Sequence, residues 1–137
     1  MKITNYSLIG LINSLNEFSD KKLPQKVSYA ITKNIMKLNQ EYSYYEKSLK
    51  NLFEKYDDCF EKDDKGEIVV QSGNPVVKKE YRSDYNKELT ELLNIEIEIE
   101  LFTIPSSYLD YDDSDKYDVL TPKEIIMLES LLCNTNE

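Results

Sequence analysis

The amino-acid sequence predicts an α+β fold in which a helical hairpin precedes a small antiparallel sheet and two short helices. Three observations lead to this prediction: a heptad-spaced apolar pattern after Pro24, an alternating pattern from Ile95 to Leu101, and a helix-capping sequence at Thr121. At 137 residues, the chain is long enough to bury most of its apolar surface without disulfides or metals. We therefore expect a single domain spanning residues 1–137, with a helical hairpin (1–56) followed by an acidic α+β portion (57–137).

A long helix is the clearest predicted element. Pro24 suits the first helical turn, where its missing N–H is not needed, and neither Pro nor Gly follows before Gly66. Apolar residues between them recur at alternating spacings of four and three, which is a heptad seam. This seam predicts a helix of about 30 residues with one stripe facing a partner helix. Its members are Ile31, Ile35, Leu38, Tyr42, Tyr45, Leu49, Leu52 and Tyr56.

We expect the partner of this seam to lie in the same chain, because an earlier segment carries a matching apolar stripe and Ser19–Leu23 is long enough for an antiparallel turn. The alternative is a homodimer in which the long helix pairs with a second copy. Tyr44 falls off the seam and is therefore free for contact with a partner. The matching stripe consists of Leu8, Leu11, Ile12, Leu15 and Phe18.

Short elements are predicted after residue 56. Glu67–Gln71 and Val76–Lys78 have the pattern of a β-hairpin around a turn at Ser72–Pro75. Ser83 is a suitable N-cap for a short helix. The inner face of that helix is expected to carry Tyr85, Leu89, Leu92 and Leu93.

A strand and a final helix complete the predicted fold. Ile95–Leu101 alternates apolar residues with glutamates, as expected for a strand with one buried face and one wet face. Thr121 and Glu124 form a capping box, with Pro122 at the first helical position. The buried residues of this helix are expected to be Ile125, Leu128 and either Leu131 or Leu132.

The charge of the chain changes sign near residue 56. Residues 1–56 carry nine lysines against five acidic residues (+4), whereas residues 57–137 carry eight basic against 21 acidic residues (−13), which gives the net charge of −9. This asymmetry favours electrostatically steered association with a basic protein surface. The sequence pI of about 4.6 argues against direct binding to nucleic acid, which normally requires a basic footprint.

Two acidic features are candidate partner-binding sites. In the loop between Pro105 and Asp118, tyrosines that can supply contact area alternate with acids that suit a basic partner. The second feature is a row of glutamates on one face of the predicted strand. The alternative for both is a solvated surface that keeps the protein soluble. Together with Tyr44, the candidates are Tyr108, Asp110, Tyr111, Asp112, Asp113, Asp115 and Tyr117 in the loop, and Glu96, Glu98 and Glu100 in the row.

Neither acidic feature predicts a specific metal site. Asp110 and Asp112 occupy the first and third positions of a calcium-loop spacing. Asp115 and Thr121, however, stand where an EF-hand requires glycine and a bidentate glutamate. We expect no bound metal and no cofactor.

The composition argues against enzyme chemistry. The chain contains no histidine, which is the commonest general base near neutral pH and the commonest metal ligand. Its three glycines are isolated, so they do not form a phosphate-binding loop, and its two cysteines have no ligand spacing. The longest apolar run, residues 8–12, is far below the roughly 20 residues needed to cross a bilayer, and no signal-peptide pattern is present.

Several phrases resemble a family of small proteins encoded by phages and prophages of Gram-positive bacteria. They are residues 21–34 (KKLPQKVSYAITKN), residues 85–89 leading into 92–98, and the closing helix that begins at Leu120-Thr121-Pro122. The resemblance spans nearly the whole chain. The family has no established activity, so the resemblance implies a phage setting and the cytoplasm of a bacterial host cell, and it assigns no catalytic residue.

Charge and resemblance together lead to a functional hypothesis. We expect a phage-encoded, non-enzymatic protein that binds and inhibits a bacterial host protein through an acidic surface. A nucleic-acid-handling defence component, such as a CRISPR effector, is the expected target, because acids can mimic phosphates in a basic channel. The alternative is a phage morphogenesis or scaffolding helper that acts by self-association.

Overall fold

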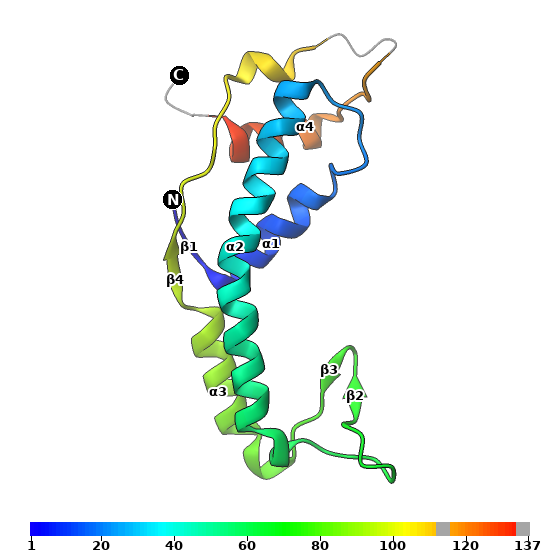
Figure 1. The fold of residues 1–137 in the computed structure, drawn as a ribbon, viewed down its shortest axis with the longest axis vertical. Helices are drawn as coiled ribbons and strands as arrows, with labels where there is room; N and C mark the ends of the chain where they lie inside the picture. Colours follow the sequence, from blue (N-terminus) through cyan, green and yellow to red (C-terminus); the bar gives the residue numbers. More distant parts are fainter. Residues whose placement is uncertain (112–115, 134–137) are drawn as a thin grey trace.

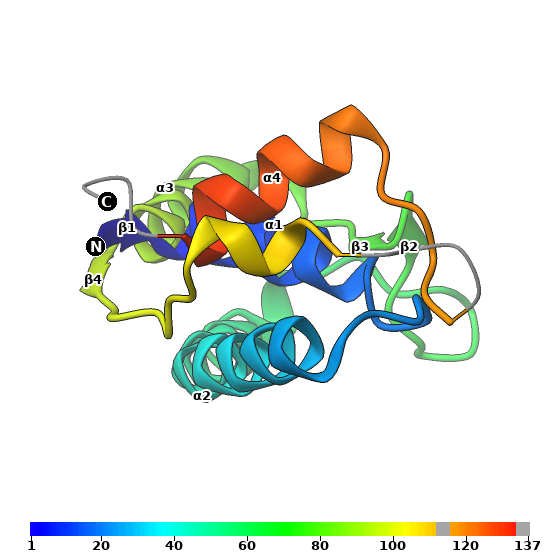
Figure 2. The ribbon, with the colours of Figure 1, turned by 90° about the horizontal axis from the view of Figure 1, so that it is seen from above.

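The computed structural model describes residues 1–111 and 116–133. Helix α2 (Gln25–Lys55) runs along most of the length of an elongated molecule (Figure 1). Helix α1 (Asn5–Asn16) packs antiparallel to the first half of α2, and α3 (Arg82–Leu93) packs against its second half. Helix α4 (Pro122–Leu132) lies on the other side of α1 from α2 (Figure 2). The described residues thus form an α+β fold that begins with the predicted helical hairpin.

The heptad seam is confirmed, but two helices cover it in turn. At the end formed by α1 and α4, Leu8, Leu38 and Leu128 are fully buried in one large apolar cluster. At the other end, Leu52 and Tyr85 belong to a smaller cluster with Phe60 and Val77. Helix α1 has only 12 residues, about 18 Å at 1.5 Å per residue, and therefore cannot cover all of the 31-residue helix α2. Helix α3 supplies the rest of the partner surface.

The predicted strand at Ile95–Leu101 is shorter than expected. Strand β4 (Glu96–Glu98) pairs antiparallel with β1 (Lys2–Thr4), which the sequence pattern did not predict. The ladder ends at Ile95, whose carbonyl accepts a hydrogen bond from the Asn5 N–H, because the chain has already turned into α1 there. Ile95 is consequently 50% exposed rather than buried.

The predicted hairpin forms with a tighter turn. Strands β2 (Val70–Gln71) and β3 (Asn74–Pro75) pair across Ser72 and Gly73 alone. Both of these residues have positive φ, 53° and 80°, as a two-residue turn between antiparallel strands requires. The prediction that Asn74 and Pro75 belong to the turn is therefore wrong, since they lie in the ladder.

Ser83 is not the N-cap of α3. A 3-10 turn, η2 (Lys79–Tyr81), runs directly into the helix, which begins at Arg82 with Tyr81 as its uncapped N-cap residue. Because Tyr81 already has helical backbone angles, Ser83 lies inside the first turn. The capping box of α4 is confirmed: the Thr121 hydroxyl accepts from the Glu124 N–H at 3.2 Å, and the Glu124 carboxylate accepts from the Thr121 N–H at 2.9 Å.

Candidate functional site

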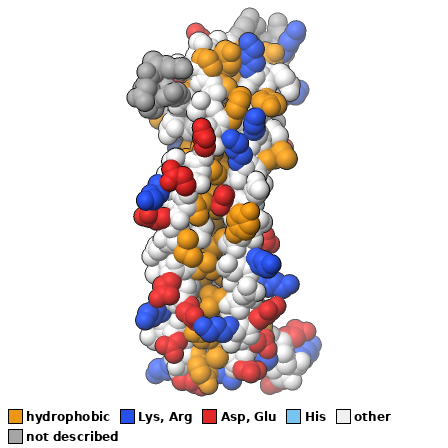
Figure 3. All heavy atoms as spheres, turned by 60° about the vertical axis from the view of Figure 1, so that its left-hand side comes forward, with side chains coloured by type: hydrophobic (Ala, Val, Ile, Leu, Met, Phe, Trp, Pro, Cys, Tyr) orange, Lys and Arg blue, Asp and Glu red, His pale blue; other side chains and the backbone are white. Residues whose placement is uncertain are grey.

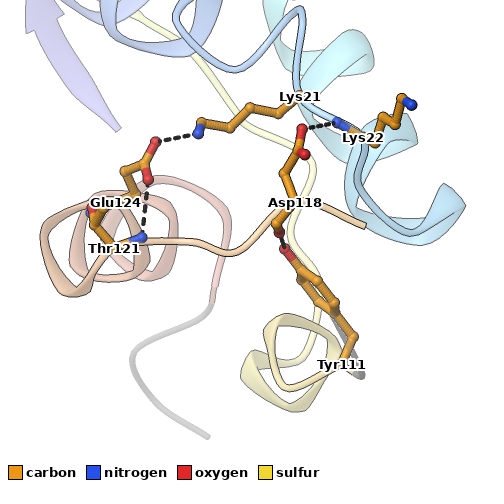
Figure 4. A network of polar contacts seen from close by, with 6 residues as sticks. All are labelled: Lys21, Lys22, Tyr111, Asp118, Thr121 and Glu124. Atoms are coloured by element: carbon orange, nitrogen blue, oxygen red, sulfur yellow. Dashed lines mark hydrogen bonds and ion pairs between the residues drawn. The ribbon is translucent and has the colours of Figure 1, made fainter. Parts of the chain in front are cut away.

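The loop rich in Asp and Tyr lies at the end of the molecule where α2 begins, and hydrogen bonds hold its base. Asp118 pairs with the turn between α1 and α2 through two bonds: the Lys22 N–H donates to its carboxylate, and its own N–H donates to the Lys22 carbonyl, both at 2.7 Å. The Tyr111 hydroxyl donates to the Asp118 carbonyl at 2.8 Å (Figure 4). The rings of Tyr111 and Tyr117 meet edge to face at 5.5 Å between centroids. Both ends of the loop are therefore fixed to each other and to the helical hairpin.

A second contact fixes the segment that follows the loop. The Lys21 ammonium lies 3.1 Å from the Glu124 carboxylate, the same group that closes the capping box of α4 (Figure 4). The Thr121 N–H and then Lys21 hold the pKa of Glu124 below its usual value. Lys21 and Lys22, which are neighbours in the turn between α1 and α2, therefore bind the start of α4 and the base of the loop, respectively.

The structure places the predicted loop residues in different environments. Asp110 is exposed, whereas Tyr108, Tyr111 and Tyr117 are half-buried. Tyr108 and Tyr111 pack against the large apolar cluster, and the Lys26 ammonium lies 4.6 Å from the centroid of the Tyr108 ring. The tyrosines therefore support the loop from within while their remaining surface stays accessible. Three candidate acids, Asp112, Asp113 and Asp115, lie outside the described residues.

The glutamate row lies elsewhere on the molecule. Glu96, Glu98 and Glu100 are exposed on the outer face of β4 and its continuation, midway along the molecule (Figure 1). Lys2 lies 3.6 Å from Glu96, and the N-terminal amine lies 3.9 Å from Glu98. The fold does not bring this row together with the Asp and Tyr loop, so the acidic candidates form two separate surfaces.

Tyr44 lies on α2 and is 61% exposed, as expected for a residue off the seam. Lys26, Lys33 and Lys37 precede it at spacings that place all four residues on one outer face of the helix. None of these lysines forms an ion pair with a carboxylate among the described residues, although the chain contains 26 acidic residues. The positive charge of residues 1–56 is thus concentrated along α2.

A cleft between α2, α3 and the β2–β3 hairpin is a feature that the sequence pattern did not predict. It has a volume of about 630 Å³, and its apolar floor includes Tyr45, Phe53 and Tyr85. Burial raises the pKa of both Tyr45 and Tyr85. Arg82, the single arginine of the chain, lines the cleft and donates to the Val77 carbonyl at 3.3 Å. These residues come from α2, α3 and the segment around the hairpin, and only the fold brings them together.

Two further observations concern the described residues. Among residues 1–111 and 116–133, no cluster of three or more Cys, Asp or Glu side chains is arranged to hold a metal ion. No helix in these ranges is both long and apolar enough to span a membrane.

Comparisons of the chain with protein-family models, with curated proteins and with solved structures find no match.

Proposed function

We propose that the chain is a phage-encoded, non-enzymatic protein that binds and inhibits a bacterial host protein in the host cytoplasm. The partner presents a basic surface, and a nucleic-acid-handling defence component, such as a CRISPR effector, fits this description. Recognition occurs through the loop from Tyr108 to Asp118, with the carboxylates occupying positions that phosphates would otherwise fill.

The observation that carries the proposal is the fixed base of the acidic loop. Binding costs free energy when a flexible loop becomes ordered, and a loop whose ends are already held loses less. Here the Asp118–Lys22 backbone pairing and the Tyr111–Tyr117 ring contact hold both ends before any partner arrives. A purely solubilising loop needs no such anchoring. The concentration of five aspartates between residues 110 and 118 supplies the complementary charge.

An infection assay tests this proposal. The protein is expressed in bacteria whose CRISPR system targets an infecting phage, and plaques are counted. We expect the parent to restore plaques, because it blocks the effector. A loop variant with Asp110, Asp112, Asp113 and Asp115 changed to Asn should lose this activity while the protein still folds.

The matched control removes four negative charges at the opposite end of the molecule. Asp58→Asn, Glu61→Gln, Asp64→Asn and Glu67→Gln change exposed residues around the turn before β2. This control should protect the phage as well as the parent does. The proposal of inhibition through the loop is contradicted if the loop variant protects fully, or if both variants fail equally.

A further inference from the structure

One face of the molecule carries three bands along its length: an acidic band, an apolar band and a basic band. Figure 3 shows hydrophobic side chains along the middle of this face, with most acidic side chains to their left and most lysines to their right over its upper part. The right side is α2, and the left side is α3 with β1 and β4. This face lies away from the α1 side of α2, so no part of the described structure covers it.

The middle band is a groove between α2 and α3 with a volume of about 500 Å³. Leu52, Leu92 and the half-exposed Ile95 supply its apolar surface. Such exposed apolar area, when it is rimmed by charge, is typical of a protein–protein contact.

The basic rim consists of residues on one outer face of α2. Lys26, Lys33, Lys37 and Tyr44 follow one another at spacings of seven, four and seven, with Lys47 on the adjacent shoulder. Lys37 donates to the Glu100 carbonyl at 2.9 Å, which fixes this rim beside the segment that continues β4. Glu41 lies among these positions, four residues after Lys37 and three before Tyr44, so the rim contains one acid and is most basic from Lys26 to Lys37.

The acidic rim comes from α3 and β4. Glu88 and Glu91 line the groove, and Glu96, Glu98 and Glu100 follow along β4 and its continuation. Lys2, the N-terminal amine and Lys55 each neighbour one of these five carboxylates, so two carboxylates have no ion pair among the described residues and this rim stays net negative. Lys55 and Glu88 form an ion pair that closes the lower end of the groove.

From this pattern we infer that the face binds a second copy of the chain in a parallel two-fold dimer. A two-fold axis along the length of the molecule carries the basic rim of one copy onto the acidic rim of the other. An axis across that length would instead place basic rim on basic rim. The charge pattern therefore selects the parallel arrangement.

The same symmetry fixes which residues meet. Rotation about an axis along the molecule keeps each residue at its own level. Lys37 and Glu100 lie at one level, because they are bonded within the chain, so Lys37 of each copy meets Glu100 of the other. Among the acids of α3, Glu91 lies nearest to the level of Lys47, whose neighbour Ser48 lines the same groove. Two charge pairs are thus predicted on each side of the axis.

The face is large enough for such a dimer. A stable interface buries about 800 Å² on each partner. Helix α2 has 31 residues and is about 46 Å long, so a strip about 17 Å wide is sufficient. Helix α3 provides that width beside the second half of α2, and β4 with its continuation lies beside the first half, where Asn34 and Lys37 bond to it. The net charge of −9 on each copy opposes association, but salt screens this repulsion beyond about 8 Å, whereas the rim contacts are shorter.

Charge-reversal variants test the dimer by sedimentation equilibrium at physiological salt. The parent should sediment at twice its chain mass of 16.1 kDa. A basic-rim variant (Lys37→Glu with Lys47→Glu) and an acidic-rim variant (Glu91→Lys with Glu100→Lys) should each be monomeric, because like charges then meet. An equimolar mixture of the two should recover the dimer mass. Neither variant changes a residue of a described ion pair.

Two controls keep the test decisive. Lys50→Glu with Lys65→Glu makes the same charge change away from the face and should leave the dimer intact. Ile95→Glu places a charge in the apolar band and should abolish dimerisation while circular dichroism stays unchanged. A monomeric parent, or charge-reversed single variants that dimerise like the parent, would overturn the inference. A basic-rim variant that pairs with the parent rather than with the acidic-rim variant would contradict the parallel arrangement.

The dimer does not depend on the proposed inhibitory function, and sedimentation requires no host target. A parallel dimer would nevertheless place the loops of both copies at the same end, where they could engage a two-site partner with increased avidity.

Discussion

The Asn34 side chain forms the two backbone hydrogen bonds that a neighbouring β-strand would otherwise supply to Phe102. It is fully buried on α2, and its amide both donates to the Phe102 carbonyl at 2.9 Å and accepts from the Phe102 N–H at 2.7 Å. The segment after β4 is thereby held against the helix without a neighbouring strand. Asn5 does the same at the start of α1, where its amide donates to the Leu92 carbonyl at 2.9 Å.

Replacing Asn34 with Ala should lower the free energy of unfolding by about 2 to 4 kcal/mol, because it leaves the partly buried N–H and C=O of Phe102 without partners. Urea denaturation measures this loss. Asn39→Ala, at an exposed position of the same helix, is the matched control and should change stability by less than about 0.5 kcal/mol. Equal stability of the two variants would show that the Phe102 contact is not structural.

Glu124 predicts part of the acid sensitivity of the protein. Its folded-state pKa is held below the usual value of 4.5 by the Thr121 N–H and by Lys21. The resulting stabilisation is complete above pH 4.5, where the unfolded chain is also ionised, and it disappears as pH falls through the lowered pKa. Glu124→Gln keeps an oxygen acceptor for Thr121 but removes the charge.

Between pH 6 and pH 3, thermal melting of Glu124→Gln should therefore decline less steeply than that of the parent. The difference in melting temperature between the parent and Glu124→Gln should therefore become smaller toward low pH. Glu129→Gln, on an exposed part of the same helix, should follow the parent curve. If the difference in melting temperature between the parent and Glu124→Gln stayed constant from pH 6 to pH 3, the charge contact between Lys21 and Glu124 would be excluded as the cause of that difference.

At the scale of elements, α2 is stabilised by its heptad seam, but the side chains of the seam are not all equally buried. Leu38 is fully buried, whereas Leu49 is partly exposed toward the cleft between α2, α3 and the hairpin. An unpaired charge in a dry core is far more costly than one that water can reach.

We expect Leu38→Asp to destabilise the protein by about 3 to 5 kcal/mol and Leu49→Asp by only about 1 to 2 kcal/mol. Chemical denaturation monitored by circular dichroism measures both. If the two variants melted together near the parent, the packing of α1 against this seam would be wrong.

The elements that the sequence could predict are those with local signals. The seam predicts α2, and the capping box predicts α4, since both depend on residues within a few turns of each other. Strand β1 was missed because three residues carry no periodicity and their pairing with β4 spans most of the chain. The start of α3 was misplaced because Ser83 has capping chemistry while a preceding 3-10 turn sets the backbone.

Prediction of the candidate site was limited in the same way. The acidic and aromatic composition of the loop is visible in the sequence, as is the exposure of Tyr44. The hydrogen bond from the Lys22 N–H to Asp118, which lies 96 residues away in the chain, could not be predicted from the sequence. Composition also could not show that the glutamate row and the loop lie apart, or that α3 and α2 form rims of opposite charge.

At the scale of the whole molecule, charge is segregated rather than evenly distributed. Lysines follow the outer face of α2 and acids the α3–β4 flank (Figure 3), and the sequence places five aspartates between residues 110 and 118. Each surface therefore has its own expected partner: the opposing flank of a second copy for the groove face, and a basic host protein for the loop.

The central claim is that the anchored acidic loop recognises a basic host protein. The most direct test measures association and dissociation rates with the purified target at low and at physiological salt. Asp110, Asp112, Asp113 and Asp115 changed to Asn should slow association at low salt and flatten its salt dependence, because exposed charges act mainly on the encounter rate. The four-charge control at Asp58, Glu61, Asp64 and Glu67 should associate at the parental rate. A loop variant that also associates at the parental rate at low salt would contradict the claim.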